Sequence, residues 1–269
     1  MSQLQDKVAI ITGSTMGIGK TLALKMAAQG AKIVLNGRNA ERLQRSLKTF
    51  EEAGYTAIGV AGDVSKVADC QKLITESIAA FGRIDILVNN AGISTEGTVA
   101  ELRPEVFAKV MDVNYMGSVY PTQLAIPHLT KSRGHVLFIS SVAGIRGIPN
   151  YAVYSSSKMA LTALAEALKI ELDHQGIHVG IAYVGFTEND PDKTIYDAQG
   201  QLIPQPKRGF VKAESPDVVA QRLIRMIEHR QFKRVFTPLG KLNALINRIS
   251  PFIVHRVLRN NYRKTKAEG

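Results

Sequence analysis

The sequence predicts a doubly wound α/β fold with a seven-stranded parallel sheet and helices on both faces. Short apolar runs alternate along the chain with stretches of helical periodicity, and this order favours parallel strands joined by crossover helices. The runs are apolar without alternation, as expected for strands that are covered on both faces. The expected strands are 7–12, 32–36, 56–61, 85–89, 135–140, 178–184 and 234–237.

Helices are expected between these strands, and several of their ends carry recognisable signals. Asn39 and Ser65 can cap the starts of the second and third helices, and Gly30, Gly54 and Gly82 can terminate the first three. A proline that suits a first helical turn begins one long helix that we expect to run from 104 to about 130. The remaining expected helices are 19–29, 40–53, 152–173 and 216–229.

Composition indicates a globular protein. The chain has 269 residues, of which 45% are hydrophobic and 21% are charged, so it can bury a large core. A single cysteine, Cys70, excludes a disulfide within the chain and favours a reducing compartment. No apolar run approaches the ~18 residues of a membrane span, and residues 1–7 lack the pattern of a signal peptide. These features predict a cytoplasmic protein.

The chain divides into a main domain, 1–240, and a basic extension, 241–269. Within the domain, residues 186–213 are polar and contain three prolines, which predicts an irregular insertion of the kind that serves as a lid. From 231 to 269 there are nine Lys/Arg and one acid, within a formal net charge of +11. Apolar residues interleave with these cations in two amphipathic helical stretches, separated by Pro251.

Three interpretations of the extension remain open. Its helices can pack on the domain with a solvated basic face, form a flap over an apolar pocket, or contact an anionic membrane surface. Nucleic-acid binding is disfavoured, because no recognition motif accompanies the charge.

Unusual polar and glycine-rich segments follow the expected strands at their carboxyl ends, where doubly wound sheets bind ligands. A glycine-rich turn follows the first strand and opens a helix, so its backbone and the helix N-terminus can approach a pyrophosphate. The turn has the spacing Gly-x-x-x-Gly-x-Gly and contains Gly13, Ser14, Thr15, Gly17, Ile18 and Gly19.

With this spacing, the sequence resembles the short-chain dehydrogenase/reductase family, whose fold is Rossmann-like. The resemblance extends to about residue 237. The segment Asn89-Asn90-Ala91-Gly92 ends the fourth strand, and Asn114 lies in the long helix. Ser141, Tyr154 and Lys158 have the family's Ser-x12-Tyr-x3-Lys spacing. All of these motifs occur in the family's order and at its expected separations, which makes a chance match improbable.

The chemistry of these residue types agrees with the resemblance. Reduction of a carbonyl requires a proton donor, and a tyrosine with an ordinary pKa of about 10 needs a nearby cation to serve near neutral pH. Tyr154 and Lys158 lie four residues apart and therefore share a helix face. We expect Tyr154 to be the acid/base, Ser141 to polarise the substrate oxygen, and Lys158 to lower the tyrosine pKa and bind the nicotinamide ribose.

The resemblance implies further roles. The family residue at Asn114 bends its helix and holds a water that relays protons from the lysine. The counterpart of Asn90 ties neighbouring strands together beside the cofactor, with Ala91 and Gly92, and Asp63 with Val64 matches the adenine-binding pair. After the sixth strand, Gly185 matches the family's glycine, and backbone groups near Thr187 could hold the carboxamide of the cofactor.

The sequence departs from the family in this last segment. The usual proline is replaced by Val184, and Asn189 stands in place of a hydroxyl residue. These changes leave the roles of Thr187 and Asn189 open. Among the six histidines only His174 and His178 are four apart, and a glycine between them argues against a metal site.

The second strand predicts the cofactor. Gly37 stands where NAD-dependent proteins carry an acid, and Arg38 follows it. A guanidinium can clamp a 2′-phosphate, which favours NADP(H). The prediction is therefore an NADP(H)-dependent carbonyl reductase or secondary alcohol dehydrogenase acting on a small apolar, lipid-like substrate. A 3-oxoacyl thioester reductase and a non-catalytic nucleotide sensor or scaffold are the alternatives. The resemblance implies a homodimer or homotetramer.

Overall fold

A computed structural model describes residues 2–188, 190, 192–205 and 213–267. Its centre is a seven-stranded parallel sheet with the order β3-β2-β1-β4-β5-β6-β9, which confirms the predicted fold class. The strands are β1 (Val8–Ile11), β2 (Lys32–Gly37), β3 (Ala57–Ala61), β4 (Ile86–Asn89), β5 (His135–Ser141), β6 (His178–Val184) and β9 (Lys233–Val235). Chain order reverses between β1 and β4, and this switch point lies where α/β sheets bind ligands.

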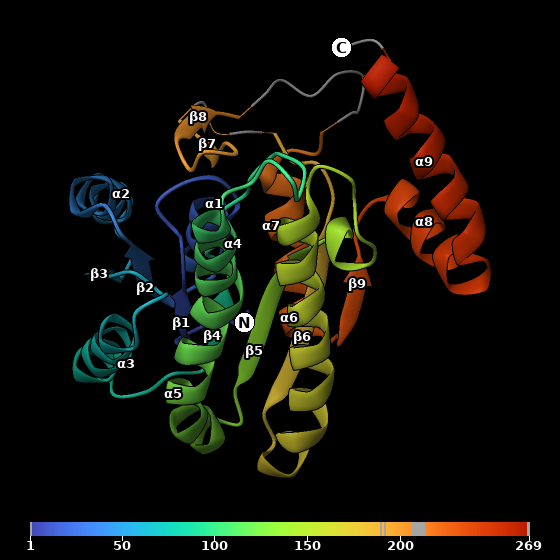
Figure 1. Cartoon of the computed structure of the whole chain (residues 1–269). Helices are drawn as coiled ribbons and strands as arrows, with labels where there is room; N and C mark the ends of the chain where they lie inside the picture. Colours follow the sequence, from blue (N-terminus) through green and yellow to red (C-terminus); the bar gives the residue numbers. More distant parts are fainter. Residues whose placement is uncertain (1, 189, 191, 206–212, 268–269) are drawn as a thin grey trace.

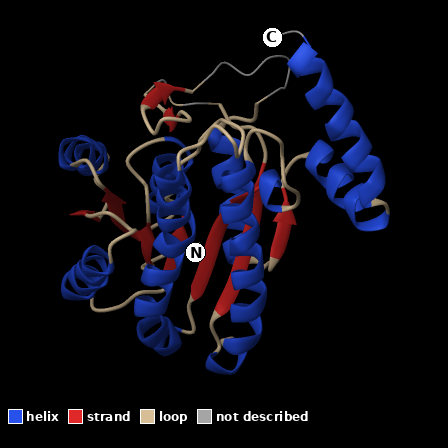
Figure 2. Cartoon of the chain, viewed as in Figure 1, coloured by secondary structure: helices blue, strands red, loops and turns tan. Residues whose placement is uncertain are grey.

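Helices cover both faces of the sheet (Figures 1 and 2). One apolar core lies between the sheet and α1 (Gly17–Ala27), α2 (Ala40–Glu52) and α7 (Pro216–Glu228). The opposite core lies under α3 (Val67–Phe81), α5 (Gly117–Ser132) and α6 (Ala152–Glu171). Since both faces are buried, the strands need continuous apolar sequence, as the sequence predicted.

The prediction of one long helix from 104 to about 130 is wrong. The structure has α4 (Pro104–Met111), a π-helical turn η1 (Asp112–Met116) and then α5. The side chain of Asn114 explains the interruption, because it is buried and bonds to the backbone of Ile93. Such single-turn π segments inside helices often mark functional positions.

The prediction that Ser65 caps the third helix is also wrong. Lys66 occupies the N-cap of α3 and makes no side-chain capping bond. The backbone N–H and hydroxyl of Ser65 instead donate to Asp63 Oδ1, at 3.0 and 2.8 Å. This local turn competes with the cap for the serine hydroxyl.

The segment expected to be irregular contains an antiparallel hairpin of β7 (Thr194–Tyr196) and β8 (Leu202–Pro204). Figure 1 shows the hairpin beyond the end of the sheet where the strands point. Besides η1, the described residues contain the short 3₁₀ helices η2 (Val142–Gly144) and η3 (Asp173–Gln175). At the β9 edge, α8 (Pro238–Ile249) and α9 (Pro251–Ala267) form a helical hairpin, with the break at Pro251 as predicted.

Candidate active site

A cavity of about 850 Å³ opens at the carboxyl ends of the strands. Its walls come from the β1–α1 turn, the ends of β2, β4, β5 and β6, the start of α6 and the β7–β8 hairpin. All the predicted site residues line it except Ser14 and Asn114. Ser14 is fully buried, and its Oγ accepts a bond from the backbone N–H of Asn36 at 3.0 Å.

The glycine-rich turn is held against the end of β4. Gly13 has a φ of +61°, and a Cβ at this position would lie 2.8 Å from Ala91 Cα, so only glycine allows this approach. Asn90 Nδ2 donates to the carbonyl oxygens of Thr12 and Gly13, both at 2.9 Å. The side chain of Asn90 therefore ties β1 to β4, and the N-terminal residues Gly17 and Ile18 of α1 border the cavity.

Lys158 is buried in the wall of the cavity, with 5% of the residue exposed. Its Nζ donates to the Ile139 carbonyl oxygen at 2.9 Å and lies 5.9 Å from the centre of the Tyr154 ring. Burial, together with the charge of Lys193, lowers the pKa of Lys158 to about 8. The ammonium thus sits beside the phenol in a poorly solvated place, where its charge acts strongly.

Asn114 is held rigidly behind the cavity. Its Oδ1 accepts from the Ile93 N–H at 2.8 Å, and its Nδ2 donates to the Ile93 carbonyl at 3.0 Å and to Ser157 Oγ at 2.9 Å. A Cβ on Gly92 would lie 3.3 Å from Asn114 Oδ1 and 3.4 Å from Lys158 Nζ. The amide and the ammonium therefore converge on the same small space beside Gly92.

Ser141 is the last residue of β5, and its Oγ accepts from the Ala143 N–H at 3.2 Å. Gly185, after β6, lies so close to Thr237 that a Cβ would collide with the threonine methyl group. Thr187 borders the cavity and pairs with Glu214 in an isolated bridge. Asn189 lies outside the described residues.

Two arginines face the cavity beyond the end of β2. Arg38 is about half exposed, and its Nη1 lies 3.8 Å from Asp63 Oδ2. Arg42, which the sequence analysis missed, lies in the first turn of α2, where Asn39 Oδ1 accepts from its backbone N–H at 2.8 Å. Its spacing of four from Arg38 could have indicated it, because the predicted cap places Arg42 at the start of that helix.

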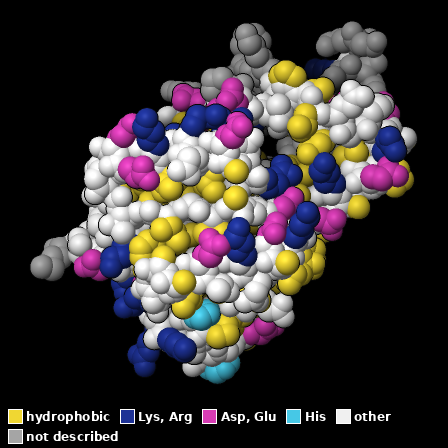
Figure 3. Space-filling model, turned by 90° about the vertical axis from the view of Figure 1, so that its left-hand side faces the viewer, with side chains coloured by type: hydrophobic (Ala, Val, Ile, Leu, Met, Phe, Trp, Pro, Cys, Tyr) yellow, Lys and Arg dark blue, Asp and Glu magenta, His cyan; other side chains and the backbone are white. Residues whose placement is uncertain are grey.

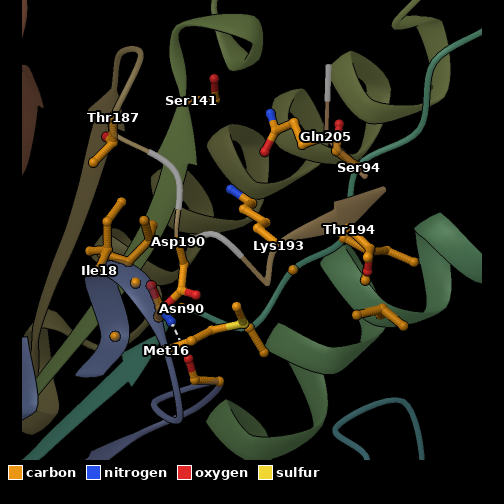
Figure 4. Close-up of a pocket in the computed structure, with 18 of the residues that line it drawn as sticks. Met16, Ile18, Asn90, Ser94, Ser141, Thr187, Asp190, Lys193, Thr194 and Gln205 are labelled. Carbon is orange, nitrogen blue, oxygen red and sulfur yellow. Dashed lines mark hydrogen bonds between the residues drawn. The ribbon is translucent and has the colours of Figure 1, made fainter. Parts of the chain in front are cut away.

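The hairpin segment adds side chains that the sequence analysis also missed. In Figure 4 the side chain of Lys193 lies between Ser141 and Met16, and the side chain of Gln205 is drawn near Ser94. No local motif marks these residues, because pairing between β7 and β8 brings them over the cavity. Other added lining residues are largely apolar, among them Ile93, Val142, Ile148, Tyr151, Phe186, Tyr196 and Leu202.

Among the described residues, no group of three or more His, Cys, Asp or Glu side chains could hold a metal ion. Cys70 is buried, and burial raises the pKa of its thiol to about 12. A thiol in that state is a poor nucleophile near neutral pH. The described helices also include none that is long and apolar enough to cross a membrane.

Comparison with known proteins identifies the family. Residues 7–200 match the family model described as short chain dehydrogenase. The chain belongs to the short-chain dehydrogenase/reductase family. This is a family of oxidoreductases that act on CH–OH and C=O groups with a nicotinamide dinucleotide.

Two plant relatives are described as 11-beta-hydroxysteroid dehydrogenase-like. The 11-beta-hydroxysteroid dehydrogenase-like 4A protein of Arabidopsis thaliana is 40% identical over 190 residues. The match covers 70% of this chain and 63% of that protein, which is less than two thirds of its length. Protein 2 of the same plant is 35% identical over 258 residues, covering 94% of this chain and 80% of its own.

A solved structure shares the architecture. It is a short-chain dehydrogenase/reductase from Burkholderia phymatum in complex with NAD, with a TM-score of 0.81 and 26% identity. The likeness covers 94% of this chain and 96% of that one.

Proposed function

We propose that this protein is an NADP(H)-dependent carbonyl reductase, or in reverse a secondary alcohol dehydrogenase, with Tyr154 as its acid/base. The observation that carries the proposal is the convergence of Tyr154, Lys158 and Ser141 on one cavity that the glycine-rich turn also borders. A buried ammonium beside a phenol is the arrangement that this chemistry needs. The presence of all three residues argues against a non-catalytic sensor.

The residues present fit a nicotinamide dinucleotide. Gly17, the first residue of α1, has a φ of +53°, and a Cβ there would meet nothing within 4 Å. The space at the N-terminus of α1 is therefore open, so backbone N–H groups can hold a pyrophosphate. Asp63 and Val64 would hold the adenine end, and Thr187 with Gly185 the carboxamide end. When bound, the reduced cofactor supplies the hydride that reduces the carbonyl carbon.

The preference for NADP(H) over NAD rests on charge. Arg38 and Arg42 both border the cavity beyond β2, and Gly37 stands at the end of that strand in place of an acid. Guanidinium groups bind phosphate in two-pronged fashion, whereas an acid would accept bonds from a ribose hydroxyl. The solved bacterial neighbour is a complex with NAD. That complex describes the neighbour and does not bear on the two arginines of this chain.

In the proposed reduction, Tyr154 donates its proton to the substrate oxygen while the Ser141 hydroxyl donates a hydrogen bond to the same oxygen. Lys158 is charged below its pKa of about 8, so it favours the phenolate that Tyr154 becomes. Asn114 would hold a water that returns a proton towards Lys158. The convergence of Asn114 Oδ1 and Lys158 Nζ beside Gly92 supports this relay.

An apolar, lipid-like carbonyl compound is the proposed substrate class. Several of the added lining residues are aliphatic or aromatic, among them Ile93, Phe186 and Leu202, and burial of an apolar substrate against them is favourable. The 11-beta-hydroxysteroid dehydrogenase-like relatives support an apolar ring system as one member of the class. We further propose that the described part of residues 186–213, which includes the β7–β8 hairpin, acts as a lid and that the enzyme assembles as a homodimer or homotetramer. Residues 189, 191 and 206–212 of this segment lie outside the described residues.

NADPH consumption against ketosteroids, long-chain ketones, aldehydes and 3-oxoacyl thioesters tests the proposal. Tyr154→Phe should lower kcat on the best substrate by at least about 100-fold while leaving NADPH binding, measured by fluorescence, nearly unchanged. Tyr55→Phe is the matched control, because Tyr55 packs on Phe50 away from the cavity.

Three outcomes separate the alternatives. Turnover that survives in Tyr154→Phe removes the assigned acid. The strongest turnover on 3-oxoacyl thioesters replaces the apolar-ketone substrate with that class. NADPH binding without turnover of any substrate in a broad panel favours a nucleotide sensor over an enzyme.

A further inference from the structure

The helical hairpin of α8 and α9 exposes an unusual amount of apolar surface. Among the described residues, seven of the fourteen large hydrophobic side chains that are exposed lie between 239 and 257. They are Leu239, Leu242, Leu245, Ile249, Phe252, Ile253 and Val257, each at least 53% exposed. Scattered exposed hydrophobic residues are ordinary, but a contiguous group of this kind marks an interaction surface.

The exposed group on α8 forms one face of an amphipathic helix. Leu242, Leu245 and Ile249 are spaced i, i+3, i+7 and therefore share a face. The opposite side faces the domain: Gly240 is buried, and Asn247 Oδ1 accepts a bond of 2.6 Å from Arg146 Nη1. Because α8 is fixed through its inner side, its outer apolar face points away from the domain.

Helix α9 exposes both apolar and basic residues. Val254 is buried, whereas Ile253 and Val257, one turn apart, are exposed. Arg256, Arg259 and Arg263 are exposed too, and their i, i+3, i+7 spacing forms a basic row along the helix. An exposed apolar group thus lies beside a row of cations.

The charge of the hairpin has one sign. Residues 238–264 contain six Lys/Arg and no Asp or Glu. By contrast, acidic and basic side chains are interspersed on the face of the molecule shown in Figure 3. Two copies of the hairpin face to face would therefore repel, whereas a negatively charged surface would attract one.

We propose that the outer face of α8–α9 docks the protein onto an anionic lipid surface. Exposed aliphatic side chains would enter the interface, and the cations would pair with acidic headgroups. The hairpin has neither the length nor the apolarity of a membrane span among its described residues, so the contact is peripheral. This proposal stands without the proposed function.

The docked hairpin would also lie next to the mouth of the cavity. Arg146, which bonds to Asn247, belongs to the loop between Ser141 and Tyr151, both of which line the cavity. A Cβ on Gly240 would meet Val142 of the same loop at 2.9 Å. If the proposed function holds, an apolar substrate dissolved in the bilayer would be close to its site.

Co-sedimentation of the full chain with vesicles tests the docking. We expect binding to phosphatidylcholine vesicles that contain about 30% phosphatidylserine, weaker binding to pure phosphatidylcholine, and weakening at high salt. One variant carries Arg256→Gln, Arg259→Gln and Arg263→Gln; each cation contributes about five-fold, so partitioning should fall about 100-fold. A second carries Leu242→Gln, Leu245→Gln and Ile249→Gln and should lose at least about ten-fold.

Matched controls keep the result specific. Ile170→Gln removes an 80% exposed apolar side chain from α6, and a variant with Arg45→Gln, Lys66→Gln and Lys131→Gln removes three exposed cations outside the hairpin. Both should bind like the original chain, and circular dichroism checks that every variant is folded.

Absence of binding to the anionic vesicles overturns the proposal. Equal losses in the control variants also overturn it, because they would show general charge attraction. If the apolar variant instead converts an oligomer into a smaller species in light scattering, without vesicle binding by the original chain, the surface joins two copies. NADPH binding, measured in parallel, separates these outcomes from a failure of the proposed function.

Discussion

Acid should destabilise this protein through a buried pair of histidines at the end of the sheet opposite the cavity. His135 and His178 are register partners on β5 and β6, and their ring centres lie 4.7 Å apart. The Nε2 atoms of both are buried and have no hydrogen-bond partner among the described residues. Burial lowers the pKa of His135 well below 6.5 and that of His178 to about 4, and the charge of Arg230 acts in the same direction.

The size of the effect follows from proton linkage. The neutral pair stabilises the fold fully above the unfolded pKa of 6.5, and this stability is lost as pH falls towards about 4. At about pH 5 the unfolded chain has bound a proton at His135 and the folded chain has not, which costs about 2 kcal/mol. His178 is partly exposed, so we reduce its share to about 1 kcal/mol.

Urea unfolding followed by circular dichroism, between about pH 7.5 and pH 5, measures this loss. A variant with His135→Leu and His178→Leu should lose about 3 kcal/mol less over that interval than the original chain. His255→Leu, which changes an exposed residue of α9, should retain the original pH dependence. Identical pH dependence in the double variant and the original chain would refute the reasoning.

Three further predictions concern single residues. Gly13→Ala should cost about 1–3 kcal/mol in urea unfolding and weaken NADPH binding, because Gly13 has a φ of +61° and a Cβ there would lie 2.8 Å from Ala91 Cα. Unchanged binding would contradict the assignment of the glycine-rich turn to the cofactor. Arg38→Asp should lower the NADPH-over-NADH ratio of kcat/KM by about ten-fold or more, and an unchanged ratio would remove the cofactor assignment. Asp85→Ala should cost about 2–3 kcal/mol, because the buried carboxylate accepts two bonds from Arg83 at 2.6 and 2.8 Å; a loss below about 0.5 kcal/mol would show that the pair is dispensable.

Much of the fold and the core of the candidate site could be predicted from sequence. Strands buried on both faces need continuous apolar residues, so the seven strands can be recognised in the sequence without knowledge of tertiary contacts. Spacing also decides some geometry: Tyr154 and Lys158, four apart in a helix, must share a face. Gly13 indicates a backbone conformation that other residues rarely adopt, and this requirement is local to the turn.

Other features depend on partners that are distant along the chain. Periodicity around Asn114 is helical, and the π turn arises because its amide bonds to the backbone of Ile93. Ser65 has the residue type of a cap, but the nearby Asp63 carboxylate binds its hydroxyl instead. Local preference is weak enough for a single such bond to change it.

The sequence by itself determined the order of strands and helices, the chemistry of the candidate site and the amphipathic character of the C-terminal segment, because each is encoded in neighbouring residues. Only the tertiary structure decided that Lys193 lies near Lys158 and that Arg42 joins Arg38 at the cavity. It also decided that His135 and His178 meet with their Nε2 atoms buried and, among the described residues, unpartnered. These juxtapositions come from strand register and hairpin pairing, which depend on the packing of the whole domain.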